Sequence, residues 1–136
     1  MNSISKNVIF YITILEKNRS EHSFLREVIH SVLPQAIVDS VYGDDEAIRY
    51  FNNYSSIPHL IFLDQEMLHL SGNNTVEHIK QVNGLEQVPI VFLTSAPGIP
   101  QNESLFQQHT DHFYSKPYEA QDLLNTVGSL NSKWIA

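Results

Sequence analysis

Three residues of this chain carry the side-chain types that phosphoryl transfer needs, and each follows a short apolar segment. Asp64, Thr94 and Lys116 offer a carboxylate, a hydroxyl and an ammonium group. A carboxylate can attack phosphorus to form an acyl phosphate. A cation and a hydroxyl can bind the oxygens of the transferred group. The three residues therefore predict a phosphoryl-accepting site, provided that the fold brings them together.

The elements that would position these residues alternate between strand-like and helix-like patterns. Short apolar runs predict five strands, over 8–15, 36–41, 59–63, 89–93 and 112–115. Each is followed by a segment with helical character, so the five units indicate a single doubly wound α/β domain with a parallel sheet. Because the carboxyl ends of parallel strands share one edge, we expect residues 64, 94 and 116 to converge there.

The helices carry capping and periodicity signals of their own. Asn18 or Ser20 can cap the first helix, and Pro34 ends it. The apolar residues of this helix repeat at helical spacing: Phe24, Leu25, Val28, Ile29 and Val32. A short fourth helix is expected over about 103–109. The last is expected over about 118–134, with four inward-facing residues: Leu123, Leu124, Val127 and Leu130.

Length, charge and composition exclude several classes of protein. The 136 residues suit one domain with a sizeable core. The formal charge of −7 comes from fifteen acids and eight bases with no basic run, which argues against direct binding to nucleic acid. The absence of cysteine excludes disulfides, thiolate–zinc sites and thiol catalysis. No apolar run approaches the roughly 18 residues of a membrane span, so we expect no membrane segment and a cytoplasmic location.

The ordered set of site residues resembles the receiver domain of two-component response regulators, the chemotaxis-regulator fold. Met67 and Gly72 follow Asp64 as in the D-x-x-M-P-x-x-x-G stretch of that family, although Leu68 stands in place of the proline. Thr94 with Ser95 is similar to the family's switch threonine and its small neighbour, and Lys116 with Pro117 to its Lys-Pro pair. The resemblance extends from about Val8 to Leu130.

This resemblance implies a flavodoxin-like fold whose five-stranded parallel sheet has the order 2-1-3-4-5. It implies that Asp64 is the phosphoacceptor and that Lys116 and Thr94 bind the phosphoryl oxygens. Phe113 falls where the family has an aromatic residue that swings inward on activation. The phosphoryl donor would be a histidine kinase or a His-containing phosphotransfer protein, and the output a contact with a downstream protein target. Enzymatic activity would be limited to self-phosphorylation from a donor and slow hydrolysis.

The acidic residues that should hold Mg²⁺ depart from the family pattern at one position. Receivers have two adjacent acids after the first strand, where this chain has Glu16 and Lys17. The resemblance therefore implies that Mg²⁺ contacts Glu16, Asp64 and the Glu66 carbonyl. Glu16, Lys17, Asp64 and Lys116 sum to zero charge, so a divalent ion would be left uncompensated. Like charges at roughly 4 Å cost about 4 kcal/mol at an intermediate dielectric. Glu66 could rotate inward and Lys17 could turn to solvent, but we still predict that Mg²⁺ binds more weakly than is usual in the family.

Two functions follow from this difference. In the first, the chain is a phosphorelay receiver that accepts a phosphoryl group on Asp64. In the alternative, Lys17 pairs permanently with Asp64, and the chain is a pseudo-receiver that acts as a phosphorylation-independent interaction module. A flavodoxin-like redox protein would need a Ser/Thr- and Gly-rich phosphate loop after the first strand, and the segment 16–19 does not provide one.

The chain is expected to be a single receiver domain over 1–136 with no output domain. Trp134 and Ile135 near its C-terminus are expected to contribute to helix packing against the neighbours of the first strand. If they are exposed instead, they would favour a homodimer.

Overall fold

The computed structural model describes residues 9–53, 56–67, 69–70, 73–94, 113–115 and 119–130. The predicted fourth helix at 103–109, as well as Lys116, Trp134 and Ile135, lies outside this part of the chain. In the residues described, no helix is both long and apolar enough to cross a membrane.

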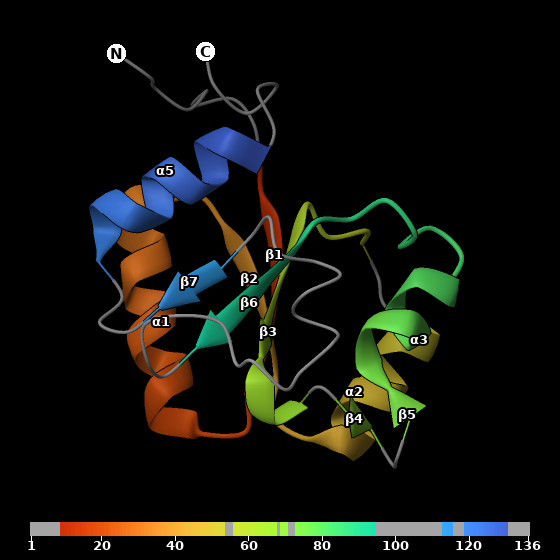
Figure 1. Ribbon diagram of the computed structural model, residues 1–136. Helices are drawn as coiled ribbons and strands as arrows, with labels where there is room; N and C mark the ends of the chain where they lie inside the picture. Colours follow the sequence, from red (N-terminus) through yellow and green to blue (C-terminus); the bar gives the residue numbers. More distant parts are fainter. Residues whose placement is uncertain are drawn as a thin grey trace.

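A five-stranded parallel sheet forms the centre of the molecule (Figure 1). Its strands lie in the spatial order β2-β1-β3-β6-β7, which is the predicted order 2-1-3-4-5. In order along the chain their bounds are Tyr11–Leu15 for β1, Ile37–Val41 for β2, Leu60–Asp64 for β3, Ile90–Thr94 for β6 and Phe113–Ser115 for β7. Every neighbouring pair is parallel. The carboxyl ends of the strands therefore share one edge, as predicted.

Helices cover both faces of the sheet (Figure 1). On one face lie α1 (Arg19–Val32) and α5 (Ala120–Leu130), and on the other lie α2 (Asp44–Asn53) and α3 (Thr75–Gln81). The prediction of an α/β fold with a parallel sheet is confirmed.

The side chains of each strand alternate between these two faces, as the pleat of a strand requires. On β1 and β3, even-numbered residues such as Ile14 and Phe62 belong to the core under α1 and α5. Odd-numbered residues such as Leu15 and Leu63 belong to the core under α2 and α3. Apart from the partly buried Tyr11, the side chains of both strands are buried, so apolar residues predominate on both faces of β1 and β3. On β1 and β3, an even residue number therefore marks a side chain on the face under α1 and α5, and an odd number one on the other face.

The first helix starts after Asn18, the first of the two capping residues that the sequence offered. Asn18 is the N-cap, and its side-chain oxygen accepts a hydrogen bond from the backbone N–H of Glu21. The helix buries Leu25 and Ile29, but Phe24 of the same apolar repeat is 51% exposed. Phe24 therefore does not contribute to the core, because the packing of α1 on the sheet buries a stripe narrower than the apolar repeat.

Several element bounds differ from the predictions. The first strand begins at Tyr11 rather than at residue 8, because its neighbour β2 begins at Ile37, directly opposite Tyr11. The last helix runs over Ala120–Leu130 within the described residues, and Leu123 and Val127 are buried in it as predicted. Leu124 is only partly buried.

A short segment after β3 was not predicted from the sequence. It consists of the 3-10 turn η1 (Gln65–Met67) and a small antiparallel pair of strands, β4 (His69–Leu70) and β5 (Asn73–Asn74). The buried hydroxyl of Thr75 donates to the Met67 carbonyl at 2.6 Å, which ties the start of α3 to the end of η1.

Candidate phosphoryl-acceptor site

The parallel register of β1 and β3 brings Glu16 and Asp64 together. Leu15 lies opposite Leu63, so Glu16 and Asp64 are the next pair along the two strands. Although β1 ends at Leu15, Glu16 is still hydrogen-bonded to the sheet, because its backbone N–H donates to the Val41 carbonyl at 3.1 Å. Both acids have even residue numbers, which on β1 and β3 belong to the face under α1 and α5. Two residues that are 48 positions apart in the chain therefore point to the same place.

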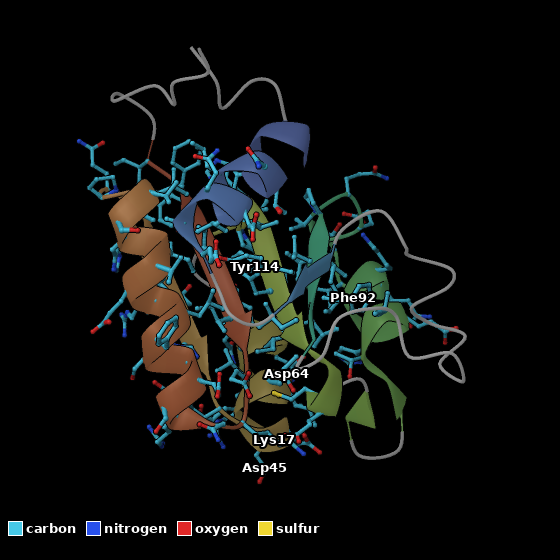
Figure 2. All side chains as sticks on the ribbon, turned by 60° about the vertical axis from the view of Figure 1, so that its left-hand side comes forward. Lys17, Asp45, Asp64, Phe92 and Tyr114 are labelled. Atoms are coloured by element: carbon cyan, nitrogen blue, oxygen red, sulfur yellow. The ribbon has the colours of Figure 1, made fainter. Side chains whose placement is uncertain are left out.

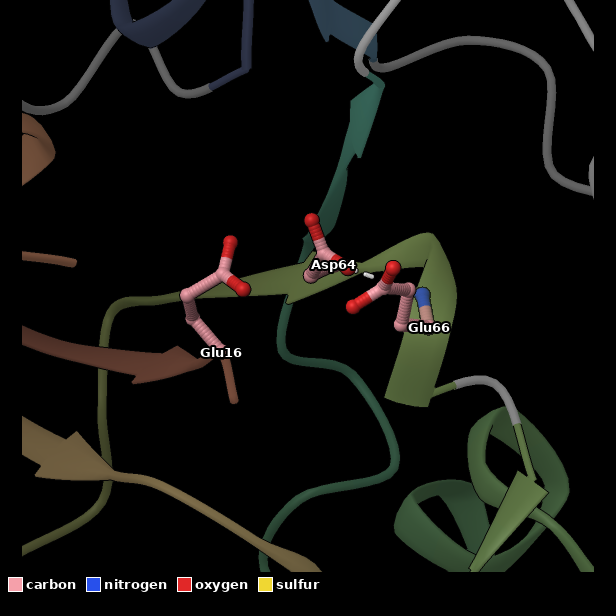
Figure 3. A group of neighbouring side chains, drawn as sticks. All are labelled: Glu16, Asp64 and Glu66. Carbon is pink, nitrogen blue, oxygen red and sulfur yellow. Dashed lines mark hydrogen bonds between the residues drawn. The ribbon is translucent and has the colours of Figure 1, made fainter. Parts of the chain in front are cut away.

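A third acid, Glu66, completes a cluster of carboxylates (Figure 3). Figure 3 shows the Glu16 and Glu66 side chains on either side of Asp64. One carboxylate oxygen from each residue lies within 4.8 Å of the other two. Glu16 is 3% exposed and Asp64 7% exposed, while Glu66 is exposed. Charged groups buried this closely are stabilised by a cation or by hydrogen-bond donors.

Local backbone hydrogen bonds orient two of the three acids. Asp64 Oδ1 accepts a hydrogen bond from the Glu66 N–H at 2.8 Å, which closes the turn into η1 and brings residue 66 back toward the end of β3. Glu16 Oε1 accepts a hydrogen bond from the backbone N–H of Asn18 at 3.1 Å, and Asn18 is the N-cap of α1. Both carboxylates are therefore held by turns that immediately follow their strands.

Lys17 lies outside this cluster. Its Nζ is 3.8 Å from Asp44 Oδ1, at the first residue of α2, and its side chain is 45% exposed. Lys17 thus pairs with Asp44 rather than with Asp64. The charge count that predicted weak Mg²⁺ binding included Lys17, whereas the structure replaces it with Glu66. The described members of the cluster carry a formal charge of −3, since Glu16, Asp64 and Glu66 each contribute −1.

The ends of β6 and β7 lie beside this cluster in the sheet. In the backbone register Asp64 is opposite Leu93, Leu93 is opposite Tyr114, and Thr94 is opposite Ser115. This places the end of β6, and the residue just before Lys116, at the same edge as Asp64. The side chains of Thr94 and Phe113, and the whole of Lys116, lie outside the described part of the structure. The meeting of residues 64, 94 and 116 at one phosphoryl group therefore stays a prediction.

Comparison with known proteins identifies the family. The family model described as the response regulator receiver domain matches residues 12–128. The chain belongs to this family. The matched range includes Glu16, Asp64 and Thr94, together with the end of β7. The chain is thus a receiver domain of two-component signalling, a class of signalling domains rather than of classical enzymes.

Two curated relatives are similar to this receiver domain in sequence. One is FilR2 of Methanothrix harundinacea, named as a probable methanogenesis regulatory protein; it is 25% identical over 130 residues, which are 93% of this chain and 84% of the relative. The other is the response regulator Rcp1 of Synechocystis, which is 27% identical over 78 residues. That match covers 57% of this chain and 53% of Rcp1.

Solved structures of response regulators share the fold. The chemotaxis response regulator CheY4 of Vibrio cholerae superposes with a TM-score of 0.69 at 13% identity, over 91% of this chain and 100% of the other. The receiver domain of a DNA-binding response regulator from Colwellia psychrerythraea gives a TM-score of 0.68 at 20% identity. That match covers 89% of this chain and 97% of the other.

The carboxylate cluster of this receiver domain fits a hard divalent cation. Mg²⁺ prefers oxygen ligands and is bound by carboxylates together with water and phosphate oxygens. At metal–oxygen distances of about 2.1 Å, the ligands of an octahedral site lie roughly 3 to 4 Å apart. The oxygens of Glu16, Asp64 and Glu66 lie within 4.8 Å of one another, so small side-chain movements would suffice. The formal charge of −3 also favours a divalent ion.

Two features of the site were not fully predicted from the sequence. The resemblance gave Glu66 a role through its backbone carbonyl, with inward rotation of its side chain as an alternative, and in the structure its carboxylate joins the cluster. The spacing Asp64-x-Glu66, with a tight turn between the two acids, was the available signal. The second feature is Asp44, which no motif in the sequence indicated as the partner of Lys17.

Proposed function

We propose that this receiver domain accepts a phosphoryl group on Asp64 from a histidine kinase or a His-containing phosphotransfer protein, and that it then signals through a contact with a downstream protein. The observation that best supports this proposal is the cluster of three carboxylate oxygens within 4.8 Å, with Asp64 in its middle (Figure 3). Structural residues seldom bury two like charges together, because the desolvation of each charge is costly.

In the proposed reaction Asp64 is the nucleophile. Its Oδ1 accepts the Glu66 N–H, so Oδ2 is the oxygen that attacks phosphorus. A bond forms between Oδ2 and phosphorus while the bond from phosphorus to the donor nitrogen breaks, and the donor imidazole keeps the electron pair of that bond. The product is an acyl phosphate on Asp64. Lys116 and Thr94 would bind two of the phosphoryl oxygens and hold the group in line for the transfer.

Charge explains why this site would also need a cation. The cluster alone carries −3 and would repel an incoming phosphoryl group, which is itself negative. Glu16, Asp64 and Glu66 would hold a Mg²⁺ ion, which supplies neutralisation of the developing charge on the phosphoryl oxygens. Lys116 would then balance the remaining unit of negative charge.

Incubation with acetyl phosphate tests this proposal. The purified chain is incubated with and without Mg²⁺, and the intact mass is measured. We expect an adduct of one phosphoryl group with Mg²⁺, and no adduct in Asp64→Asn or in the presence of a chelator. Glu66→Gln should bind Mg²⁺ more weakly while keeping the turn, because the backbone N–H of residue 66 is unchanged. An unlabelled wild-type protein, or a labelled Asp64→Asn variant, would contradict the proposal.

The alternative function, a phosphorylation-independent pseudo-receiver, depended on a permanent pair between Lys17 and Asp64. Lys17 is instead paired with Asp44 at 3.8 Å, so this alternative has no structural support from the lysine. A downstream partner that binds wild type and Asp64→Asn equally, with or without acetyl phosphate, would favour it.

The remaining expectations for the receiver stay predictions. They are the switch roles of Thr94 and Phe113, a single domain without an output domain, a cytoplasmic location, and a homodimer through Trp134 and Ile135.

A further inference from the structure

We infer that Asp44 is a positioning residue for the carboxylate cluster: it holds Lys17 on the opposite face of the sheet and so keeps the cluster available to a divalent cation. The inference rests on the proposed function of that cluster as a cation-dependent phosphoryl acceptor. It assigns a role to Lys17, the residue that replaces one of the two acids usual in receivers.

The alternation of side chains along β1 starts the argument. Glu16 continues the sheet beyond β1, and its even parity places it on the face under α1 and α5 with Asp64. The face on the other side of the sheet is covered by α2 and α3, and Leu15, the last residue of β1, packs there. The chain bends at Lys17, directly after Glu16 and before the N-cap Asn18 of α1. The Lys17 side chain extends to Asp44 at the start of α2, whereas that of its neighbour Glu16 joins the cluster.

Asp44 is placed to receive this lysine. It is the first residue of α2, directly after the short connection from β2, and β2 is the neighbour of β1. A carboxylate in the first helical turn is stabilised by the helix dipole, so Asp44 does not depend on Lys17 to stay there. Lys17 Nζ lies 3.8 Å from Asp44 Oδ1, and this oxygen is itself shielded from solvent. In this pair the position of Asp44 is set by α2, whereas the long side chain of Lys17 can change its conformation.

The carboxylate cluster is a second position that the Lys17 ammonium group could occupy. Glu16, the residue before Lys17, belongs to the cluster of three carboxylates, and the formal charge of −3 on this cluster attracts an ammonium group. An ammonium group among these oxygens would occupy the space and the charge that a divalent cation needs. The pair with Asp44 is partly exposed, at 45% for Lys17 and 32% for Asp44. Such pairs are weak, so the loss of one carboxylate can change the position of the lysine.

Calorimetry of Mg²⁺ binding to the full chain tests this inference. Asp44→Asn should lower the Mg²⁺ affinity about five-fold, since Lys17 then competes for the cluster. Asp45→Asn is the matched control, because it removes the same charge from the same helical turn and Asp45 is exposed (Figure 2). We expect Asp45→Asn to change the Mg²⁺ affinity less than about two-fold, because solvent and salt screen the long-range effect of an exposed charge. The double variant Lys17→Met/Asp44→Asn should return to within about two-fold of the affinity of Lys17→Met.

Acetyl phosphate labelling gives a second readout. Asp44→Asn should gain labelling without Mg²⁺, because Lys17 then supplies a cation beside Asp64, and this gain should disappear in the double variant. Equal Mg²⁺ affinities of Asp44→Asn and Asp45→Asn would overturn the inference. So would a double variant that remains as weak as Asp44→Asn.

A measurement on the metal-free protein separates this inference from the proposed function. The backbone amide NMR signals of residues 64 and 66 report on the surroundings of the cluster. Replacing Lys17 by Met should move these signals in the Asp44→Asn background but not in the wild-type background. If the wild-type protein is never phosphorylated, the proposed function fails while this comparison still tests the lysine. If the wild-type protein is phosphorylated and the signals respond equally in both backgrounds, only the inference fails.

Discussion

The Oδ1 atom of Asp64 accepts a hydrogen bond from the backbone N–H of Glu66 at 2.8 Å. The residue proposed as the phosphoacceptor thus also closes the turn that follows β3. Its two roles are separable, because an asparagine side chain keeps the oxygen acceptor and loses the charge, whereas alanine loses both.

We expect Asp64→Asn to be more stable than Asp64→Ala by about 1 kcal/mol, the net contribution of one hydrogen bond. Both variants remove the same charge from the carboxylate cluster, so the relief of repulsion cancels in the comparison. Urea unfolding of the two variants at pH 7 measures the difference. Equal midpoints would show that the hydrogen bond to Glu66 does not stabilise the turn.

His22 makes the fold sensitive to acid. Its ring is fully buried, and Nε2 is hydrogen-bonded to the Ser40 hydroxyl between α1 and β2. Burial, together with the nearby charges of Arg26 and Arg19, lowers the pKa of His22 to about 4. The unfolded chain therefore binds this proton more readily than the folded one between pH 6.5 and 4.

It follows that His22 reduces stability as the pH falls from 6.5 toward 4, by roughly 2 kcal/mol. His22→Gln should lose this contribution and show a flatter dependence of unfolding free energy on pH. Urea unfolding of both proteins at pH 7, 6 and 5 gives the comparison. Parallel curves would mean that His22 takes up its proton in the folded state without cost.

Tyr114 links the last strand to the last helix. It is 2% exposed, and its hydroxyl donates to the Glu119 carbonyl at 2.6 Å. Tyr114→Phe leaves that carbonyl without this donor and should cost about 1 to 2 kcal/mol of stability at pH 7. Thermal or urea unfolding measures the loss, and an unchanged midpoint would contradict it.

The same tyrosine predicts a response to alkali. Burial, together with the charges of Asp122 and Glu119, raises the pKa of Tyr114 above its usual value of 10. The stability that this shift provides is fully present below pH 10 and is lost as the pH rises through the raised folded-state pKa. The wild-type protein should therefore lose stability above pH 10 more steeply than Tyr114→Phe. Unfolding midpoints recorded from pH 9 upward distinguish the two.

Phe24 and Leu25 are neighbours on α1 with opposite surroundings. Leu25 is fully buried, whereas Phe24 is 51% exposed. Leu25→Ala should cost about 2 to 5 kcal/mol of unfolding free energy, because it creates a cavity in the core under α1 and α5. Phe24→Ala should change it by less than about 0.5 kcal/mol. Urea unfolding of the two variants tests the assignment, and a large loss in Phe24→Ala would show that this ring is packed.

The order of the elements and the ends of the strands were predictable from the sequence. Continuous apolar runs predicted β3 and β6, because strands buried on both faces have no polar alternation. The cap at Asn18 was predictable for a similar reason, since a helix start depends on the residues within one turn. The positions of Asp64 and Thr94 at strand ends are therefore set by the residues next to them in the chain.

Which way several side chains turn was decided only by the tertiary structure. The apolar repeat on α1 did not reveal that Phe24 would be exposed, because the buried stripe depends on how the helix packs. The family pattern predicted that Glu16 would join Asp64, but nothing in the sequence indicated that Lys17 would pair with Asp44. Their directions come from the pairing of β1 with β2 and β3, which is a contact between segments far apart in the chain. Local sequence determines where a strand ends, whereas the neighbours of that strand determine which charges meet there.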